Sequence, residues 1–184
     1  ASGRGAMEQP NATGDGDVPL TVRFWIAVVL TGIGAGFVGV ALMFVLFSVQ
    51  GLAFGAWGPT ADVEAAVAAA GPLHRVLPLL AAGIIAGVGW YVLRRTTSGP
   101  AEVDDAIWRG DGKLSVARST GTSVLSEIVV GLGASLGREA APKLMGGVCG
   151  SVLAGPLGLT PAQRRLLVAC GAGAGVAAVY NVPL

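Results

Sequence analysis

Long apolar stretches separated by short polar connections make up most of the chain. The first stretch covers residues 22–52 and carries no charged residue after Arg23. Further apolar stretches cover residues 75–93, 119–136, 140–153 and 166–179. A membrane-spanning helix needs about 20 apolar residues, so residues 22–52 are long enough to cross a bilayer with tilt or protrusion. The pattern predicts an all-α, polytopic membrane protein.

The connections between these stretches are of two kinds. Residues 57–73 contain two Gly-Pro pairs together with Asp62 and Glu64, which predicts a loop with a short surface helix. Residues 96–118 concentrate charged side chains, and residues 101–108 within them have a short helical pattern. We expect this second connection to be aqueous or half-buried.

The distribution of Lys and Arg predicts an orientation. These residues lie in the N-terminal tail, at Arg23, at residues 94–118 and at residues 164–165. The loop at residues 51–74 contains no Lys or Arg. By the positive-inside rule, we expect the N-terminus on the cytoplasmic side of the cell inner (plasma) membrane.

The first residues of the chain differ from the rest. Residues 1–20 are rich in Gly, Asp, Asn and Pro and lack the apolar core of a signal peptide. We expect a disordered cytoplasmic tail at residues 1–20 and a transmembrane domain at residues 21–184.

The composition excludes several classes of function. Of the 184 residues, 53% are hydrophobic and 12% are charged, compared with about 25% charged residues in soluble domains. The net charge of +1 provides no basic field for nucleic acid. Cys149 and Cys170 both lie in apolar stretches, so we expect buried free thiols and neither a disulfide nor a metal site. No cofactor is expected.

Glycine is abundant, with 30 residues. The spacing of residues 34–39 matches a dinucleotide-binding loop, but that loop requires a preceding strand, and here the glycines lie inside an apolar span. Pairs four residues apart instead predict close helix packing. These pairs are Gly32/Gly36, Gly83/Gly87, Gly146/Gly150 and Gly171/Gly175.

Arg138 and Glu139 interrupt the apolar region between residues 119 and 153. A charge at this depth costs about 2.5 to 3.5 kcal/mol and must be housed in protein or water. Gly137 before the pair and Pro142 after it predict a helix that begins here. The unpaired amides of Arg138, Glu139 and Ala140 would then carry a partial positive charge and form an anion site. Alternatively, the two charges pair with each other and are structural.

Two motifs carry a family resemblance. Residues 137–142, Gly-Arg-Glu-Ala-Ala-Pro, resemble the G-R-E-G-P signature of the CLC chloride channels and chloride/proton antiporters. Gly146-Gly147 and the Ala/Gly run at residues 171–175, which leads to Tyr-Asn-Val-Pro-Leu at residues 180–184, also resemble this family. The resemblance covers residues 22–184.

The resemblance implies a CLC-type inverted-repeat fold with broken intramembrane helices, of which this chain would hold the first repeat only and would be incomplete at its C-terminal end. It implies a homodimer in which each subunit transports chloride or a similar small anion through the lipid bilayer, as a channel or a chloride/proton antiporter. Ionised Glu139 would compete with chloride for the amides at its own helix start, and protonation would remove the competitor. Arg138, Glu139 and Ala140 would then bind the anion.

Three further residues are candidates. In the family, a serine of a G-S-G-I-P motif binds chloride, and Ser98 in Thr-Ser-Gly-Pro is the nearest match, one residue short and with the proline displaced. Lys143 lies one helical turn after Glu139 and is a possible modulator, either by holding the carboxylate or by adding positive potential. Glu127 lies within a predicted span and is expected to face a polar crevice, to relay protons, or to line an interface near Arg138.

Two alternatives remain open. Ser135 lies in Gly-Ala-Ser-Leu-Gly, which has the spacing of a serine-hydrolase nucleophile turn, so an intramembrane serine hydrolase is possible in principle. Its base would have to be His74, the single histidine, which is placed in an outer loop. The other alternative is a membrane fragment that does not transport. The transporter interpretation predicts that the chain is not an enzyme.

Overall fold

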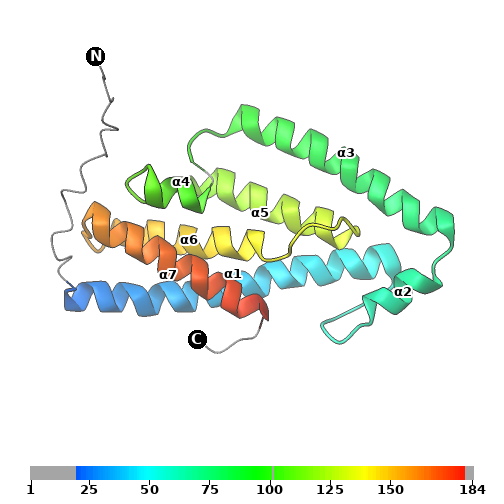
Figure 1. Cartoon of the computed structure of the whole chain (residues 1–184), viewed down its shortest axis with the longest axis horizontal. Coiled ribbons are helices and arrows are strands. Elements are labelled where there is room, and N and C mark those ends of the chain that lie inside the picture. The colour runs from blue at the N-terminus through cyan, green and yellow to red at the C-terminus, as the bar shows by residue number, and fades with distance from the viewer. Residues whose placement is uncertain (1–19, 101, 181–184) are drawn as a thin grey trace, which may run out of the picture.

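The computed structural model describes residues 20–100 and 102–180, which form seven α-helices and no strand (Figure 1). The helices are Val22–Phe54 (α1), Val63–Ala69 (α2), Pro72–Thr96 (α3), Val103–Trp108 (α4), Val116–Gly131 (α5), Ala140–Ala154 (α6) and Pro161–Tyr180 (α7). The prediction of an all-α fold is confirmed. The predicted tail, apart from Leu20, and residues 181–184 lie outside the described residues.

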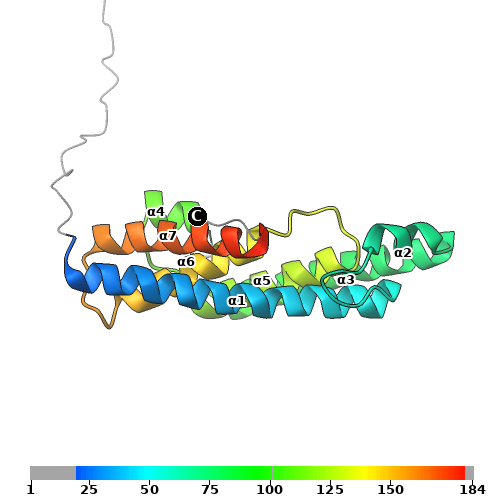
Figure 2. The same ribbon diagram turned by 90° about the horizontal axis from the view of Figure 1, so that it is seen from below.

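Helix α1 runs along the length of the molecule (Figure 2). Its 33 residues make it about 50 Å long, more than the thickness of a bilayer core. By length and composition alone, α1 and α3 are each apolar enough to cross a membrane. Helix α1 ends at Gly55, whose φ of 72° is the left-handed conformation that commonly stops a helix.

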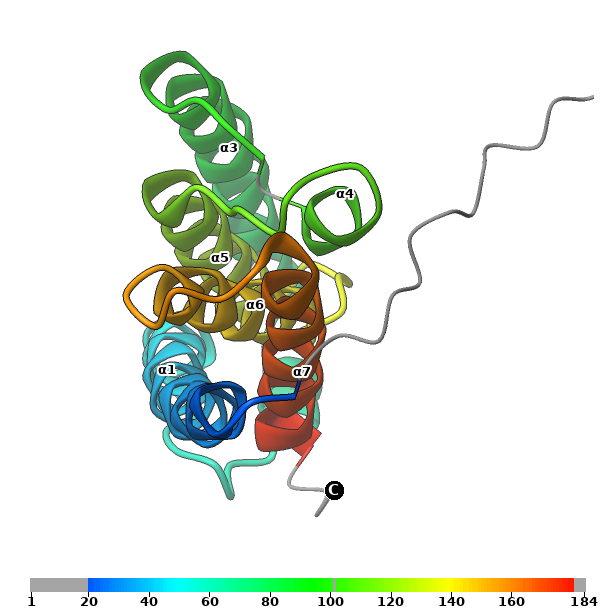
Figure 3. The same cartoon turned by 90° about the vertical axis from the view of Figure 1, so that its left-hand side faces the viewer.

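Helix α6 lies at the centre of the bundle, surrounded by α1, α5, α7 and the short α4 (Figure 3). Its buried residues include Leu144, Met145 and Val148, which pack with Leu42 of α1 and Val168 of α7. Helix α3 packs mainly on α5 and has a single buried residue, Ala82. The core is therefore built on α6, and α3 lies outside it.

The closest helix contact joins α6 to α7. A Cβ atom added to Gly146 would collide with the carbonyl oxygen of Gly171, and one added to Gly175 would collide with the carbonyl oxygen of Pro142. Gly150 lies equally tightly against Leu167. The glycines of these two helices thus let the backbones touch, which confirms the packing predicted for both pairs.

The same prediction is wrong for the glycines of α1 and α3. A Cβ at Gly32, Gly36, Gly83 or Gly87 would meet no heavy atom within 4 Å among the described residues. On α1 the buried positions include Ala27, Thr31 and Ala35. Gly32 and Gly36 each follow one of these by a single residue, a rotation of about 100° that takes them off the packed face.

The cysteine prediction is correct in one respect and wrong in another. Both thiols are free, but Cys149 is half-buried and Cys170 is exposed. On α7, the buried face contains Leu167, Val168 and Gly171. Cys170 is about 100° around the helix from Gly171 and off this face, so an apolar sequence around it does not make it buried.

The connection at residues 57–73 contains the short helix that the sequence predicts for it. The short helix α2 begins at Asp62, whose side chain accepts a hydrogen bond of 2.9 Å from the amide of Ala65. Helix α7 begins with a reciprocal cap, in which the Thr160 amide donates to the Gln163 side chain and the Gln163 amide donates to the Thr160 hydroxyl. These caps fix where each helix starts.

A candidate anion site at the start of helix α6

The chain between α5 and α6 leaves the helical path at Gly131 and returns to it at Ala140. Glu139 is the N-cap residue of α6, and its carbonyl accepts the first helical hydrogen bond, 3.0 Å from the amide of Lys143. Pro142 lies in the first turn, where its missing N–H is tolerated. The helix therefore begins where the sequence predicted, and its first-turn amides have no acceptor within the helix.

The Glu139 side chain turns back toward the chain that precedes it. It makes no capping hydrogen bond to its own helix, and a Cβ added to Gly137 would collide with the carboxylate. The hydroxyl of Tyr180 donates to Oε2 of Glu139 over 3.2 Å. The Arg138 guanidinium carbon lies 6.0 Å from the centre of the same tyrosine ring. The carboxylate is thus half-buried, between a glycine and a tyrosine of another helix.

The contact between Glu139 and Tyr180 follows from the packing of α6 on α7. Gly175 lies against Pro142 in the first turn of α6. Tyr180 lies little more than one helical turn beyond Gly175, at the last position of α7. The glycine contacts therefore set the register that brings the phenol to the carboxylate.

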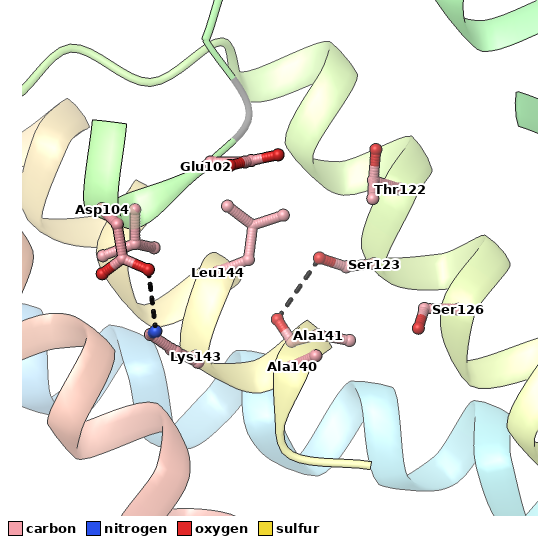
Figure 4. Close-up of a pocket in the computed structure, with 10 residues that line it drawn as sticks. Glu102, Asp104, Thr122, Ser123, Ser126, Ala140, Ala141, Lys143 and Leu144 are labelled. Atoms are coloured by element: carbon pink, nitrogen blue, oxygen red, sulfur yellow. Dashed lines mark hydrogen bonds and ion pairs between the residues drawn. The ribbon is translucent and has the colours of Figure 1, made fainter. Parts of the chain in front are cut away.

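A cavity of about 260 Å³ lies beside this helix start (Figure 4). It is lined by Glu102, Val103 and Asp104 at the start of α4, by Thr122, Ser123 and Ser126 of α5, and by Ala140, Ala141, Lys143 and Leu144 of α6. The Ser123 hydroxyl donates to the carbonyl oxygen of Ala141 over 3.3 Å. Of the predicted anion-binding residues, Ala140 lines this cavity, and Arg138 and Glu139 directly precede it in the chain.

Lys143 has a different partner from the one that its sequence position offers. Its Nζ lies 3.5 Å from Oδ2 of Asp104 on α4 (Figure 4), whereas Glu139 is bonded to Tyr180. The proposed pairing of Lys143 with Glu139 within the helix is therefore wrong. The positive charge of Lys143 still lines the cavity.

Ser98 is exposed and does not line the cavity. It lies in the loop after α3, which is held by a hydrogen bond of 3.0 Å from Nη1 of Arg118 to the carbonyl oxygen of Gly99. A second bond of 3.0 Å runs from the Ser115 amide to the carbonyl oxygen of Pro100. Within the described residues, the structure does not bring Ser98 together with the start of α6.

Ser135 is exposed in the connection before α6. The Nε2 atom of His74 lies 2.9 Å from the carbonyl oxygen of Ala53. No hydrogen bond joins His74 to Ser135 in the described part of the chain. The nucleophile and base of the hydrolase alternative are therefore not assembled in this structure.

Glu127 is 1% exposed, and neither of its carboxylate oxygens has a hydrogen-bond partner among the residues that the structure describes. Arg138 interacts with it electrostatically. The sequence predicts a polar crevice, a proton relay or an interface near Arg138 for Glu127, and the position near Arg138 agrees with the structure. The side chain lies inside the bundle.

Sequence reasoning missed two partners of the site. In the sequence, Tyr180 stands out only as part of a motif, and its contact with Glu139 depends on a helix register that no local pattern encodes. Asp104 belongs to a charged connection in which nothing distinguishes it from Asp105.

The structure combines two long apolar helices with a helix that begins inside an apolar region, at an acidic residue. These features are those of a membrane protein with an internal polar site. The model of the voltage gated chloride channel family matches residues 80–184. The chain therefore belongs to the voltage-gated chloride channel (CLC) family, and it is a membrane protein.

Curated relatives agree with this assignment. The voltage-gated ClC-type chloride channel ClcB of Yersinia pestis is 39% identical over 105 residues, which are 57% of this chain and 25% of the relative. The putative chloride channel protein ClcB-like of Ralstonia nicotianae is 38% identical over 116 residues, 60% of this chain and 27% of the relative. ClcB of Escherichia coli is 35% identical over 118 residues, 61% of this chain and 28% of the relative. The chain thus spans about a quarter of the length of these relatives, and no solved structure matches it.

Proposed function

We propose that this chain forms part of a pathway that carries chloride or a similar small anion across a membrane, with Glu139 as its protonatable gate. The observation that carries the proposal is the break between α5 and α6, which puts the free amides of a helix start and a carboxylate in one place. Backbone amides at a helix start attract anions. The names of the relatives, which are chloride channels, support chloride as the ion.

Ionised Glu139 lies beside the helix start without a hydrogen bond to the amides of α6, and its negative charge repels an anion from that place. The Tyr180 hydroxyl stabilises the carboxylate in this position. When a proton binds the carboxylate, its charge disappears, its attraction to the helix start weakens, and the side chain can rotate away. The amides of α6 and the Tyr180 hydroxyl are then available to a passing anion. Each cycle binds and releases one proton, and no covalent bond other than O–H is formed.

The wider assignment follows from the same proposal. We expect a homodimer in the cell inner membrane with its N-terminus in the cytoplasm, with protons and chloride as the transported or bound ions, and without enzymatic activity. Whether protons move in exchange for the anion distinguishes an antiporter from a channel, and a proton flux measurement decides it. Ser98 binds the anion only if its loop approaches the start of α6 in the intact protein.

The test is anion flux through the intact protein in liposomes over a range of pH. Glu139→Gln should keep the flux and lose most of its dependence on pH, because the amide cannot bind a proton. Glu64→Gln, at an exposed position on α2, is the matched control and should behave as the original protein. A Glu139→Gln protein with an unaltered pH profile would refute the gate.

A further inference from the structure

A row of polar side chains is buried on one face of α5. Ser119, Ser123 and Glu127 follow each other at intervals of four residues and are 0%, 1% and 1% exposed. Residues spaced by four lie above one another on a helix. We call these three side chains the polar row of α5. The other buried polar side chains of the described residues are Thr31 and Gln163, on other helices, so a row of three on one helix face is unusual.

The polar row faces α6 and not α3. On the α3 side of α5, Leu125 lies against Gly89, and Gly121 lies against Leu93. Ser123, by contrast, donates a hydrogen bond to the carbonyl oxygen of Ala141 in α6. Glu127 is one turn beyond Ser123 on the same face, so it lies in the interior of the bundle.

The polar atoms of the row are left largely without partners. Within residues 20–100 and 102–180, the Ser119 hydroxyl and both oxygens of Glu127 have no hydrogen-bond partner. A buried carboxylate with no hydrogen bond is strongly unfavourable, and such a group instead takes up a proton. A fully packed structural glutamate would be expected to have at least one donor, so a purely structural role does not account for Glu127.

The charged groups around Glu127 are few. Helix α1 has no ionisable side chain after Arg23. Helix α6 carries Lys143, which is paired with Asp104, and Cys149. The ionisable residues of α3 lie near its two ends and are His74, Arg75, Tyr91, Arg94 and Arg95. Arg138, in the connection before α6, is the group that interacts with Glu127 electrostatically.

Arg138 also belongs to the surroundings of Glu139. It directly precedes Glu139, and its guanidinium lies over the tyrosine that bonds the Glu139 carboxylate. The cavity beside α6 is lined by Ser123, and Glu127 is one turn, or about 6 Å of helix rise, from that wall. The cavity therefore reaches Ser123, the neighbour of Glu127 in the polar row of α5.

We propose that Glu127 is a second proton-binding carboxyl, reached from the cavity through Ser123, and that it shares the Arg138 guanidinium with Glu139. The proton-binding part stands without a transport function, and only the coupling rests on the proposed gate. When Glu127 loses its proton, its negative charge offsets part of the positive charge that Arg138 presents to Glu139. Protonation of Glu139 then becomes easier, and the gate opens at higher pH.

Infrared spectroscopy of the intact protein tests proton binding directly. The original protein should show the carbonyl band of a buried protonated carboxylic acid at neutral pH. Glu127→Gln should lose this band, whereas Glu139→Gln and the exposed control Glu64→Gln should keep it. A band that survives in Glu127→Gln overturns the proposal. If this variant does not fold, Glu127→Asp replaces it, and a carbonyl band with unchanged frequency then overturns the proposal.

Anion flux tests the coupling. The negative charge of Glu127 opposes Arg138 only where the pH is high enough to ionise Glu127. In Glu127→Gln the flux that remains above neutral pH should therefore fall, whereas the flux at acidic pH, where Glu127 is already protonated, should be unchanged. Glu127→Asp should restore the flux above neutral pH. Unchanged flux above neutral pH in Glu127→Gln overturns the coupling. If Glu139→Gln keeps its pH-dependent flux, the proposed gate fails, and the infrared result still decides whether Glu127 binds a proton.

Discussion

Glu139 and Glu127 both interrupt apolar stretches of the sequence, but the structure gives the two carboxylates opposite surroundings. Glu139 is the N-cap residue of α6, half-buried, with a hydrogen bond from Tyr180. Glu127 lies inside α5, one turn before its end, is 1% exposed and has no hydrogen-bond partner in the described part of the chain. The amides in the middle of a helix are already used by the helix itself, whereas those at its start are free. A carboxylate at a helix start therefore lies near unbonded amides, and a carboxylate inside a helix does not.

The largest effect is expected from a substitution that forces α6 and α7 apart, because the contact between these helices brings Tyr180 to Glu139. Gly146→Val would force a side chain into the backbone of α7 at Gly171. We expect a loss of about 3 kcal/mol or more in the free energy of unfolding, because neither backbone can move aside without opening the core. Denaturant unfolding of the intact protein in detergent measures this loss.

The control is Gly32 of α1, where an added Cβ would meet no heavy atom within 4 Å among the described residues. Gly32→Ala should change the free energy of unfolding by no more than about 1 kcal/mol, and in the stabilising direction, because alanine favours a helix. Equal effects of the two substitutions would mean that α6 and α7 are not in backbone contact.

An intermediate effect is expected from removal of the Tyr180 hydroxyl, which donates a hydrogen bond to Glu139. Tyr180→Phe keeps the ring beside Arg138 and removes the hydroxyl that donates to Glu139. A hydrogen bond to the charged carboxylate favours the ionised form, so its removal makes proton binding easier. The pH of half-maximal flux should rise by about half a unit to one unit, measured in liposomes.

Tyr91→Phe serves as the control for this change. Tyr91 is exposed on α3 and has the Arg95 guanidinium over its ring, which phenylalanine preserves. If both substitutions move the midpoint by the same amount, the Tyr180 hydroxyl does not act on Glu139.

The smallest effect is expected at Lys143. Both members of its pair with Asp104 are substantially exposed, and such pairs contribute less than about 1 kcal/mol. Lys143→Met should therefore alter the free energy of unfolding by less than about 0.5 kcal/mol. The pH profile of flux should also remain close to that of the original protein.

Lys113→Met, at an exposed position in the connection between α4 and α5, is the comparison for Lys143. A large change in the pH profile that is specific to Lys143→Met would indicate that Lys143 acts on Glu139 after all.

The features that the sequence predicted correctly are local ones. The start of α6 follows from Gly137 and Pro142, and the short helices α2 and α4 follow from the polar connections in which they lie. The features that it predicted wrongly depend on packing. A pair of glycines four residues apart marks a close helix contact only if it falls on a packed face, as Gly171/Gly175 does and Gly32/Gly36 does not.

The same reasoning explains the errors and omissions at the candidate site. Lys143 has a possible partner within its own helix, but a carboxylate on α4 is closer. The contact of Tyr180 with Glu139 joins residues 41 positions apart, and it depends on the register of two helices. Chemistry that depends on one turn of helix can be read from the sequence, and chemistry that depends on two helices meeting requires the structure.

The glycine contacts between α6 and α7 also limit how the site can move. Where the two backbones touch, no side chains lie between them that could repack during a movement. We therefore expect α6 and α7 to move together as one rigid unit. Access to the helix start then has to change by rotation of single side chains, above all Glu139. Such rotations are far faster than the rocking of whole helices.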